Sequence, residues 1–205
     1  MAMKNVIDDL QRSREKSLDR INAFSDGIFA IIITIMVLDL KRPETASFAA
    51  LGHTWPTWVS YIASYLFIAI VWVNHHYLLK NATRTTWRLI WANFGHLFVV
   101  SLIPFLTGWM AETRLEAVPV AFYAFDFFLV NLSYLGLIRQ TDSETRHGNE
   151  KARRLFHLRS IGTLLLALTA SAVAFWLPGL GFGLICCCFL LYLRPEAPKL
   201  GQPFP

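Results

Sequence analysis

The sequence predicts an all-α integral membrane protein built as a bundle of six transmembrane helices. Hydrophobic residues make up 55% of the 205-residue chain. Charged residues make up 16%, whereas a soluble domain carries about 25%. Six apolar runs approach the roughly 20 residues that a helix needs to cross a bilayer, and they lie at 24–40, 58–79, 89–110, 118–138, 161–177 and 179–193.

The ends and interruptions of these runs allow further predictions. The first and last runs are short for a bilayer, so we expect their helices to extend into the flanking residues or to cross where the bilayer is thin. We predict a tight turn at Leu177-Pro178-Gly179, between the fifth and sixth runs, because Pro and Gly interrupt helices. The runs show no obvious break in the middle of the membrane.

The Lys and Arg residues alternate between the segments that join the runs. Sixteen of the 19 lie before the first run, in the second and fourth loops and after the last run, and the other loops hold only Lys41, Arg42 and Arg114. Because basic loops stay in the cytoplasm, we predict a multi-pass protein of the inner (plasma) membrane with both termini cytoplasmic. This distribution explains the net charge of +5 without nucleic acid.

Three parts of the chain are predicted. Residues 1–17 form a cytoplasmic N-terminal arm, residues 18–194 hold the six transmembrane helices, and residues 195–205 are a Pro-rich tail expected to be disordered. The sequence has no phosphate-binding loop and no zinc-protease motif. The consecutive residues Cys186, Cys187 and Cys188 would point about 100° apart on a helix. We therefore predict packing residues there, no metal site and no enzymatic activity.

The first run contains an ionisable residue, Asp26, about one turn from its start. Ionisable residues within membrane helices are costly and usually functional. In the predicted topology, the start of the first helix, the end of the second and the start of the third lie together near the cytoplasmic face. Hydrogen bonds there would satisfy polar groups that lipid cannot, and the expected participants are Ser25, Asp26, His75 or His76, and Asn93. An ordinary interfacial belt of polar residues is the alternative.

Two further features have more than one interpretation. Asp126 lies in the fourth run with Asn131, and His96, at a comparable predicted depth, is its candidate partner. The role of Asp126 stays open. In the first run one helical stripe contains Ile31, Ile35 and Leu38, with Thr34 beside it. Periodicity alone favours a lipid-facing or packed stripe, but a constriction that gates by dewetting would use the same residues.

The residues Arg20, Phe24, Ser25 and Asp26 have the spacing Arg-x-x-x-Phe-Ser-Asp. With this signature the chain resembles the transmembrane protein 175 family of potassium channels. The resemblance covers roughly residues 18–110. It also rests on residues 27–34, on the run Trp72-Val73-Asn74-His75-His76, and on Trp91, Asn93 and Pro104-Phe105.

The resemblance implies a potassium-permeable cation channel that conducts passively and uses no cofactor. Prokaryotic members have six helices per chain and assemble as homotetramers in which the first helix lines a central pore. By position, Ile31, Ile35 and Leu38 would form the constriction, and Thr34 would contribute to potassium preference. Like the family, this sequence lacks the Thr-Val-Gly-Tyr-Gly filter. A polar network would hold the helix ends together without touching the ion, and it would comprise Arg20, Phe24, Ser25, Asp26, Trp72, Asn74, His75, His76 and Asn93.

Two other functions remain as alternatives. A proton-coupled secondary transporter would use Asp26 or Asp126 as a proton relay. Against it, the sequence shows no inverted repeat and no evident mid-membrane break. A membrane enzyme would have to use His75, His76 and Asp26, and no nucleophile accompanies them.

Overall fold

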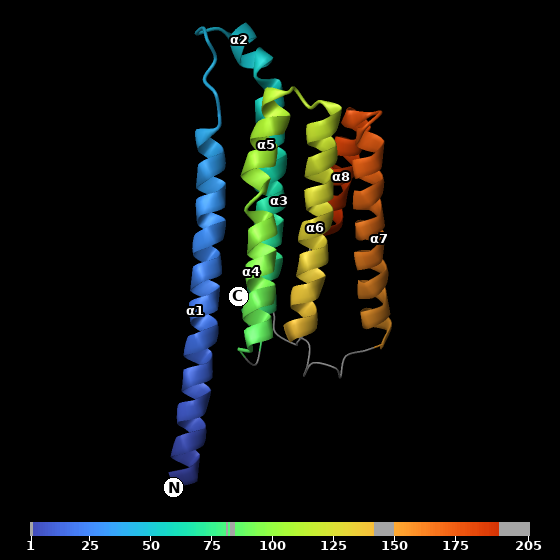
Figure 1. Ribbon diagram of the computed structural model, residues 1–205. Coiled ribbons are helices and arrows are strands. Elements are labelled where there is room, and N and C mark those ends of the chain that lie inside the picture. The colour runs from blue at the N-terminus through green and yellow to red at the C-terminus, as the bar shows by residue number, and fades with distance from the viewer. Residues whose placement is uncertain (1, 81, 83–84, 142–149, 193–205) are drawn as a thin grey trace.

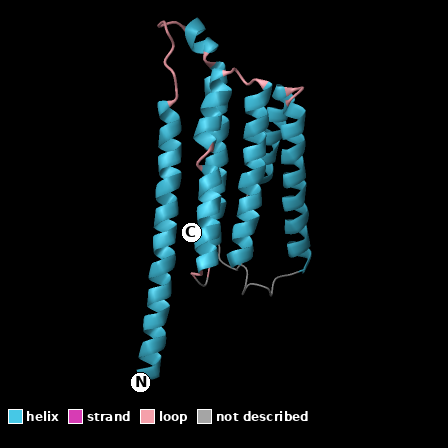
Figure 2. Ribbon diagram, viewed as in Figure 1, coloured by secondary structure: helices cyan, strands magenta, loops and turns pink. Residues whose placement is uncertain are grey.

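The computed structural model describes residues 2–80, 82, 85–141 and 150–192, and all regular structure in these residues is helical (Figure 2). The helices are α1 Ala2–Leu38, α2 Phe48–His53, α3 Trp55–Lys80, α4 Trp87–Val100, α5 Ile103–Glu112, α6 Ala117–Thr141, α7 Glu150–Ala174 and α8 Pro178–Tyr192. Except for the short α2, they stand side by side as an up-and-down bundle (Figure 1). The long α1 stands at one side and extends beyond its neighbours at its N-terminal end.

Length and composition identify four helical segments able to cross a membrane. They are Lys16–Leu38, Trp55–Lys80, Trp87–Glu112 and Ala117–Thr141, and two shorter apolar helices follow at Leu158–Ala174 and Pro178–Phe189. The prediction of an all-α membrane protein is therefore confirmed. The first span also begins before residue 24, as its short apolar run required.

The third span is interrupted, although the sequence analysis expected no break. Figure 2 shows a short loop between α4 and α5, which are stacked end to end. The Leu102 N–H turns back to the Val99 carbonyl, at 3.0 Å, in a tight turn. Pro104, which has no N–H to donate to the Val100 carbonyl, lies in the first turn of α5. The expectation of an unbroken span is wrong because Pro104 ends the regular hydrogen bonding of α4.

The turn between α7 and α8 also differs from the prediction. It occupies residues 175–177, where the Leu177 N–H donates to the Val173 carbonyl at 2.8 Å. Pro178 is the first residue of α8, a position that proline favours because its missing N–H would have no helical partner. Gly181 allows the two helices to meet closely, since an added Cβ would lie 2.7 Å from the Cβ of Ala174.

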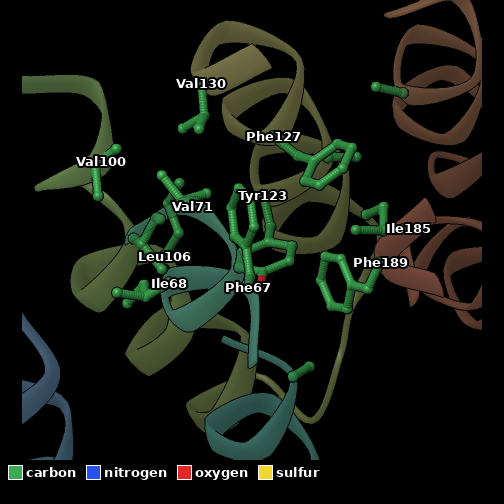
Figure 3. Packing of buried hydrophobic residues seen from close by; sticks show 14 of the residues in the cluster. Phe67, Ile68, Val71, Val100, Leu106, Tyr123, Phe127, Val130, Ile185 and Phe189 are labelled. Atoms are coloured by element: carbon green, nitrogen blue, oxygen red, sulfur yellow. The ribbon is translucent and has the colours of Figure 1, made fainter. Parts of the chain in front are cut away.

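The core of the bundle is rich in aromatic side chains. The ring of Phe67 on α3 lies 4.8 Å from that of Phe127 on α6 and 5.5 Å from that of Phe189 on α8 (Figure 3). A chain of buried hydroxyls also crosses the core, because Thr107 on α5 donates to Ser64 on α3 and Ser64 donates to Tyr123 on α6. Such packing and hydrogen bonding hold helices together in lipid, where the hydrophobic effect contributes little.

Candidate functional site

One face of α1 packs against the bundle. Phe29, Ile32 and Met36 recur at helical spacing, and their exposed fractions are 1%, 4% and 2%. Through this face α1 contacts α3, α5 and, more narrowly, α4. The C-terminal end of α1 is also linked to α5, because Lys41, just beyond the helix, lies 2.6 Å from Glu112. An exposed ion pair of this kind contributes about 0–1 kcal/mol, so the apolar face accounts for most of the attachment.

The opposite face of α1 is uncovered within the single chain. Ile31, Ile35 and Leu38 are 56%, 45% and 80% exposed, and Thr34 beside them is exposed as well. The Thr34 hydroxyl donates its proton to the Ile31 carbonyl at 2.9 Å, so its oxygen keeps lone pairs available to a further partner. The four residues singled out by the sequence therefore lie together on the side of α1 that faces away from the core.

A buried hydrogen-bonded chain connects α1 to α4 and α3 behind this face. His75 Nε2 on α3 lies 2.7 Å from Asn93 Oδ1 on α4, and Asn93 Nδ2 donates to Ser25 Oγ on α1 at 3.0 Å. The Ser25 hydroxyl in turn donates to the Ile21 carbonyl at 2.9 Å. The three side chains are at most 2% exposed, so each bond is made out of reach of water.

The chain of donors fixes the protonation pattern of His75. An amide oxygen only accepts, so His75 must donate through its Nε2–H. Asn93 then donates through Nδ2 to Ser25 Oγ. The hydroxyl proton of Ser25 is already donated to the Ile21 carbonyl of α1. With the Asn93 amide in this orientation, the donors run from α3 through α4 to α1. Removing Asn93 would leave a buried donor without a partner, at a cost of about 1–3 kcal/mol.

Asp26 is held by a tryptophan, not by a histidine. Trp72 Nε1 donates to Asp26 Oδ1 at 2.8 Å, and the Trp72 ring lies 5.5 Å from that of His76. Of the two candidate histidines, only His75 joins the hydrogen-bonded chain to α1. His76 is next to it on α3 and therefore points about 100° away. The expected contact of a histidine with Asp26 is replaced by the Trp72 bond.

Three further residues of the expected polar network are Arg20 and Phe24 on α1 and Asn74 on α3. Phe24 packs edge-to-face on Phe94 of α4, with ring centres 5.4 Å apart, and Arg20 is exposed one turn earlier. The Asn74 amide donates to the Ile70 carbonyl of its own helix, and the Asn74 backbone carbonyl accepts from Tyr134 on α6. Asn74 therefore links α3 to α6.

The proposed pairing of Asp126 with His96 is wrong. His96 Nδ1 bonds Ser133 at 2.9 Å, and its ring stacks on that of His75 with centres 5.7 Å apart. Ser133 is seven residues beyond Asp126 on α6, which is about 10 Å along the axis. His96 therefore lies about two turns away from Asp126. Asp126 is 3% exposed, and its carboxylate accepts no hydrogen bond from the described residues.

Several functional side chains escaped the sequence analysis. Ser133 and Tyr134 on α6, and Ser64 and Thr107 in the hydroxyl chain, link helices in the structure. The only signal for them is a polar residue inside an apolar run. Ser and Thr also satisfy themselves within one helix, so the sequence could not identify which of them reach across.

Fold and site together define a multi-pass helical membrane protein. In it α1 packs and hydrogen-bonds to the bundle on one side and exposes an apolar face on the other. The family model for the endosomal/lysosomal potassium channel TMEM175 matches residues 20–104. A Chryseobacterium protein named as a potassium channel is 32% identical over 179 residues, which cover 86% of this chain and 93% of that protein. A Streptomyces collinus protein, also named as a potassium channel, is 36% identical over 126 residues, covering 58% of this chain and 61% of its own.

A solved structure agrees with these relatives. The crystal structure of a Chamaesiphon minutus homologue of TMEM175, a lysosomal potassium-selective channel, superposes with a TM-score of 0.77 and 26% identity. The match covers 86% of this chain and 96% of that one. The chain belongs to the TMEM175 family, a family of channels and not of enzymes. The resemblance inferred from Arg20, Phe24, Ser25 and Asp26 is confirmed.

Proposed function

We propose that the protein is a passive potassium-permeable cation channel in which four copies surround a central pore lined by α1. The observation that carries this proposal is the uncovered face of α1, with Ile31, Ile35 and Leu38 exposed on a helix whose other face is buried. Relatives over most of the chain are named potassium channels. Potassium is the permeant ion here, and no cofactor takes part.

The apolar side chains of this face form the constriction. Four copies of Ile31, Ile35 and Leu38 around an axis make stacked rings of alkyl groups. Such rings offer an ion no ligands, so a dehydrated ion gains nothing there and a narrow dry neck is a barrier. Ile31 forms the narrowest ring.

Thr34 supplies polar atoms between these rings. Because its proton is donated to the Ile31 carbonyl, its oxygen can present only lone pairs to the lumen. Four such oxygens can replace part of the hydration shell of a cation. With few fixed dipoles and no carbonyl filter, the pore discriminates potassium from sodium only modestly.

Opening requires α1 to turn or move outward against its anchors. The bond from Asn93 to Ser25 and the bond from Trp72 to Asp26 fasten its inner part to α4 and α3. These contacts lie on the side of α1 away from Ile31, so they control the position of the helix without touching the ion. Gating motions of α1 are therefore coupled to the bundle at this level.

The chain crosses the inner membrane six times with both termini in the cytoplasm. The four long spans are followed by α7 and α8 as the fifth and sixth. Sixteen of the 19 Lys and Arg residues lie before the first apolar run or in alternate segments after it, which favours this topology. Residues 1–17 form the cytoplasmic arm, residues 18–194 the channel domain, and residues 195–205, which lie outside the described residues, the tail. A periplasmic signal from a reporter fused to either terminus would overturn this topology.

A proton-coupled transporter is the second candidate, and two observations favour it. Asp126 is a buried acid without a hydrogen-bond partner among the described residues, and the third span is broken. In transporters, buried acids relay protons and interrupted helices form the binding site. Purified protein in a planar bilayer separates the two functions. A channel gives unitary current steps without a proton gradient, whereas uptake that saturates and requires protons would refute the channel.

A further inference from the structure

Asp126 on α6 is a buried acid that the proposed pore does not use. It is 3% exposed, and neither of its carboxylate oxygens accepts a hydrogen bond from the described residues. The helices packed against α6 offer no counter-charge, because residues 55–79, 89–111 and 160–192 contain no Lys, Arg, Asp or Glu. A carboxylate without donors or a cation is costly inside a membrane bundle. The neutral form of the carboxyl is therefore favoured, and that form has a proton to donate.

The break between α4 and α5 leaves a backbone acceptor without its regular donor. Pro104 has no N–H, so the α-helical bond to the Val100 carbonyl cannot form. The Leu102 N–H does not replace it, because it donates to the Val99 carbonyl. Val100 is 0% exposed, and a buried carbonyl needs a donor. At a proline in a membrane helix, a side chain of a neighbouring helix can supply that donor.

The spacing of residues on α4 and α6 brings the acid and the break to one level. The bond between His96 on α4 and Ser133 on α6, at 2.9 Å, shows which sides of these helices face each other. Asp126 is seven residues before Ser133, so it lies on the same side of α6 and about 10 Å along the axis. α4 runs antiparallel to α6 (Figure 1). Val100, four residues after His96, therefore lies on the facing side of α4, about 6 Å in the same direction, and its carbonyl points onward along the axis.

We propose that Asp126 is a proton-binding site, in which the neutral carboxyl donates its O–H to the Val100 carbonyl freed by the break. One proton then satisfies two buried groups that otherwise lack a donor and an acceptor. The bond links α6 to the third span where the hydrogen bonding of that span is interrupted. Loss of the proton would set a charged carboxylate against a carbonyl oxygen, so protonation of Asp126 and the geometry of the break are coupled. The inference is independent of which face of α1 lines the pore.

Other titratable groups near this part of α6 do not take the place of the Asp126 proton. They are Tyr123 on α6 itself, His75 and His96 on α3 and α4, and Cys186 and Cys188 on α8. Phenols and thiols are neutral at pH 7. The two histidine rings stack on each other, and His96 is bonded to Ser133 about two turns from Asp126. α5 before Glu112 and α7 after Arg159 add no titratable side chain.

Infrared spectroscopy of the full chain in lipid bilayers at neutral pH tests the protonation. We expect a C=O stretching band of a protonated carboxyl group, which Asp126→Asn should remove. Asp39→Asn is the matched control, because Asp39 is exposed beyond the end of α1, and it should leave the band unchanged. A wild-type spectrum without the band overturns the proposal, and so does a band that persists in Asp126→Asn.

Solid-state NMR of the chain labelled with ¹³C at the Val100 carbonyl tests the acceptor. The resonance should move upfield in Asp126→Leu, which has no donor, and stay near its wild-type position in Asp126→Asn, whose amide can still donate. An unmoved resonance in Asp126→Leu would exclude Val100 as the partner.

A double-mutant cycle with Pro104→Ala tests the link to the break without spectroscopy. Alanine restores an N–H four residues after Val100, so Asp126→Leu should lower the free energy of unfolding less in the Pro104→Ala background than in the wild type. Costs that add independently would overturn the proposal.

Discussion

Replacing Asn93 with leucine removes the side chain that links α3 and α4 to α1. The bond from His75 and the bond to Ser25 are both lost. Interhelical hydrogen bonds in membrane proteins contribute about 0.6 kcal/mol on average and up to about 1.7 kcal/mol. His75 also keeps a buried donor without a partner, which adds a cost. Ser25 loses less, because its proton remains on the Ile21 carbonyl. We expect Asn93→Leu to lower the free energy of unfolding by about 1–3 kcal/mol.

Reversible unfolding in detergent or bicelles measures this free energy. Thr169→Val is the control, since Thr169 is exposed and bonds only the Leu165 carbonyl of its own helix, and it should change stability by about 0.5 kcal/mol or less. In a double-mutant cycle, Ser25→Ala should cost less when Asn93 is already leucine. The reasoning fails if Asn93→Leu is as mild as Thr169→Val, or if the costs at Asn93 and Ser25 add independently.

Three further predictions concern single side chains. Asp26→Ala should reduce tetramer yield without changing ion preference, because the Trp72 N–H loses its hydrogen-bond acceptor. Trp72→Phe, which removes the donor of the same bond, should have the same effect. Normal tetramers with altered selectivity would instead place Asp26 in the pore. Thr34→Val should lower the potassium-to-sodium permeability ratio measured from reversal potentials, and an unchanged ratio would remove Thr34 from the lumen. Asp126→Asn should leave current per tetramer intact, whereas its loss would favour the proton-coupled alternative.

The sequence was most informative where chemistry and topology constrained each other. Asp26, His75 and Asn93 come from three different helices, and charge alternation alone brought their ends to one level. The structure places all three there. The four residues of the α1 stripe also share one face, because helical periodicity fixes direction around an axis.

The sequence could not predict which of these side chains hydrogen-bond to each other. Adjacent residues such as His75 and His76 differ only in rotation about α3, so the packing of α3 decided which one joins the hydrogen-bonded chain. The depth of His96 relative to Asp126 was misjudged by about two turns, since small offsets between helices accumulate over several loops. The break before α5 was visible in the sequence as Pro104, but a proline inside an apolar run is also compatible with a continuous membrane helix.

The central claim is that the uncovered face of α1 lines the pore, and neighbouring residues on that helix test it most directly. Ile31 is 56% exposed and Ile32 is 4% exposed, so the two side chains carry the same group toward opposite environments. The measurement is potassium current and reversal potential for Ile31→Asn and Ile32→Asn, normalised to tetramer abundance. Ile31→Asn should hydrate the neck, raise the current and weaken potassium preference, while Ile32→Asn should mainly reduce the amount of folded tetramer. Wild-type conduction in Ile31→Asn together with a gain of current in Ile32→Asn would contradict the assignment of the pore face.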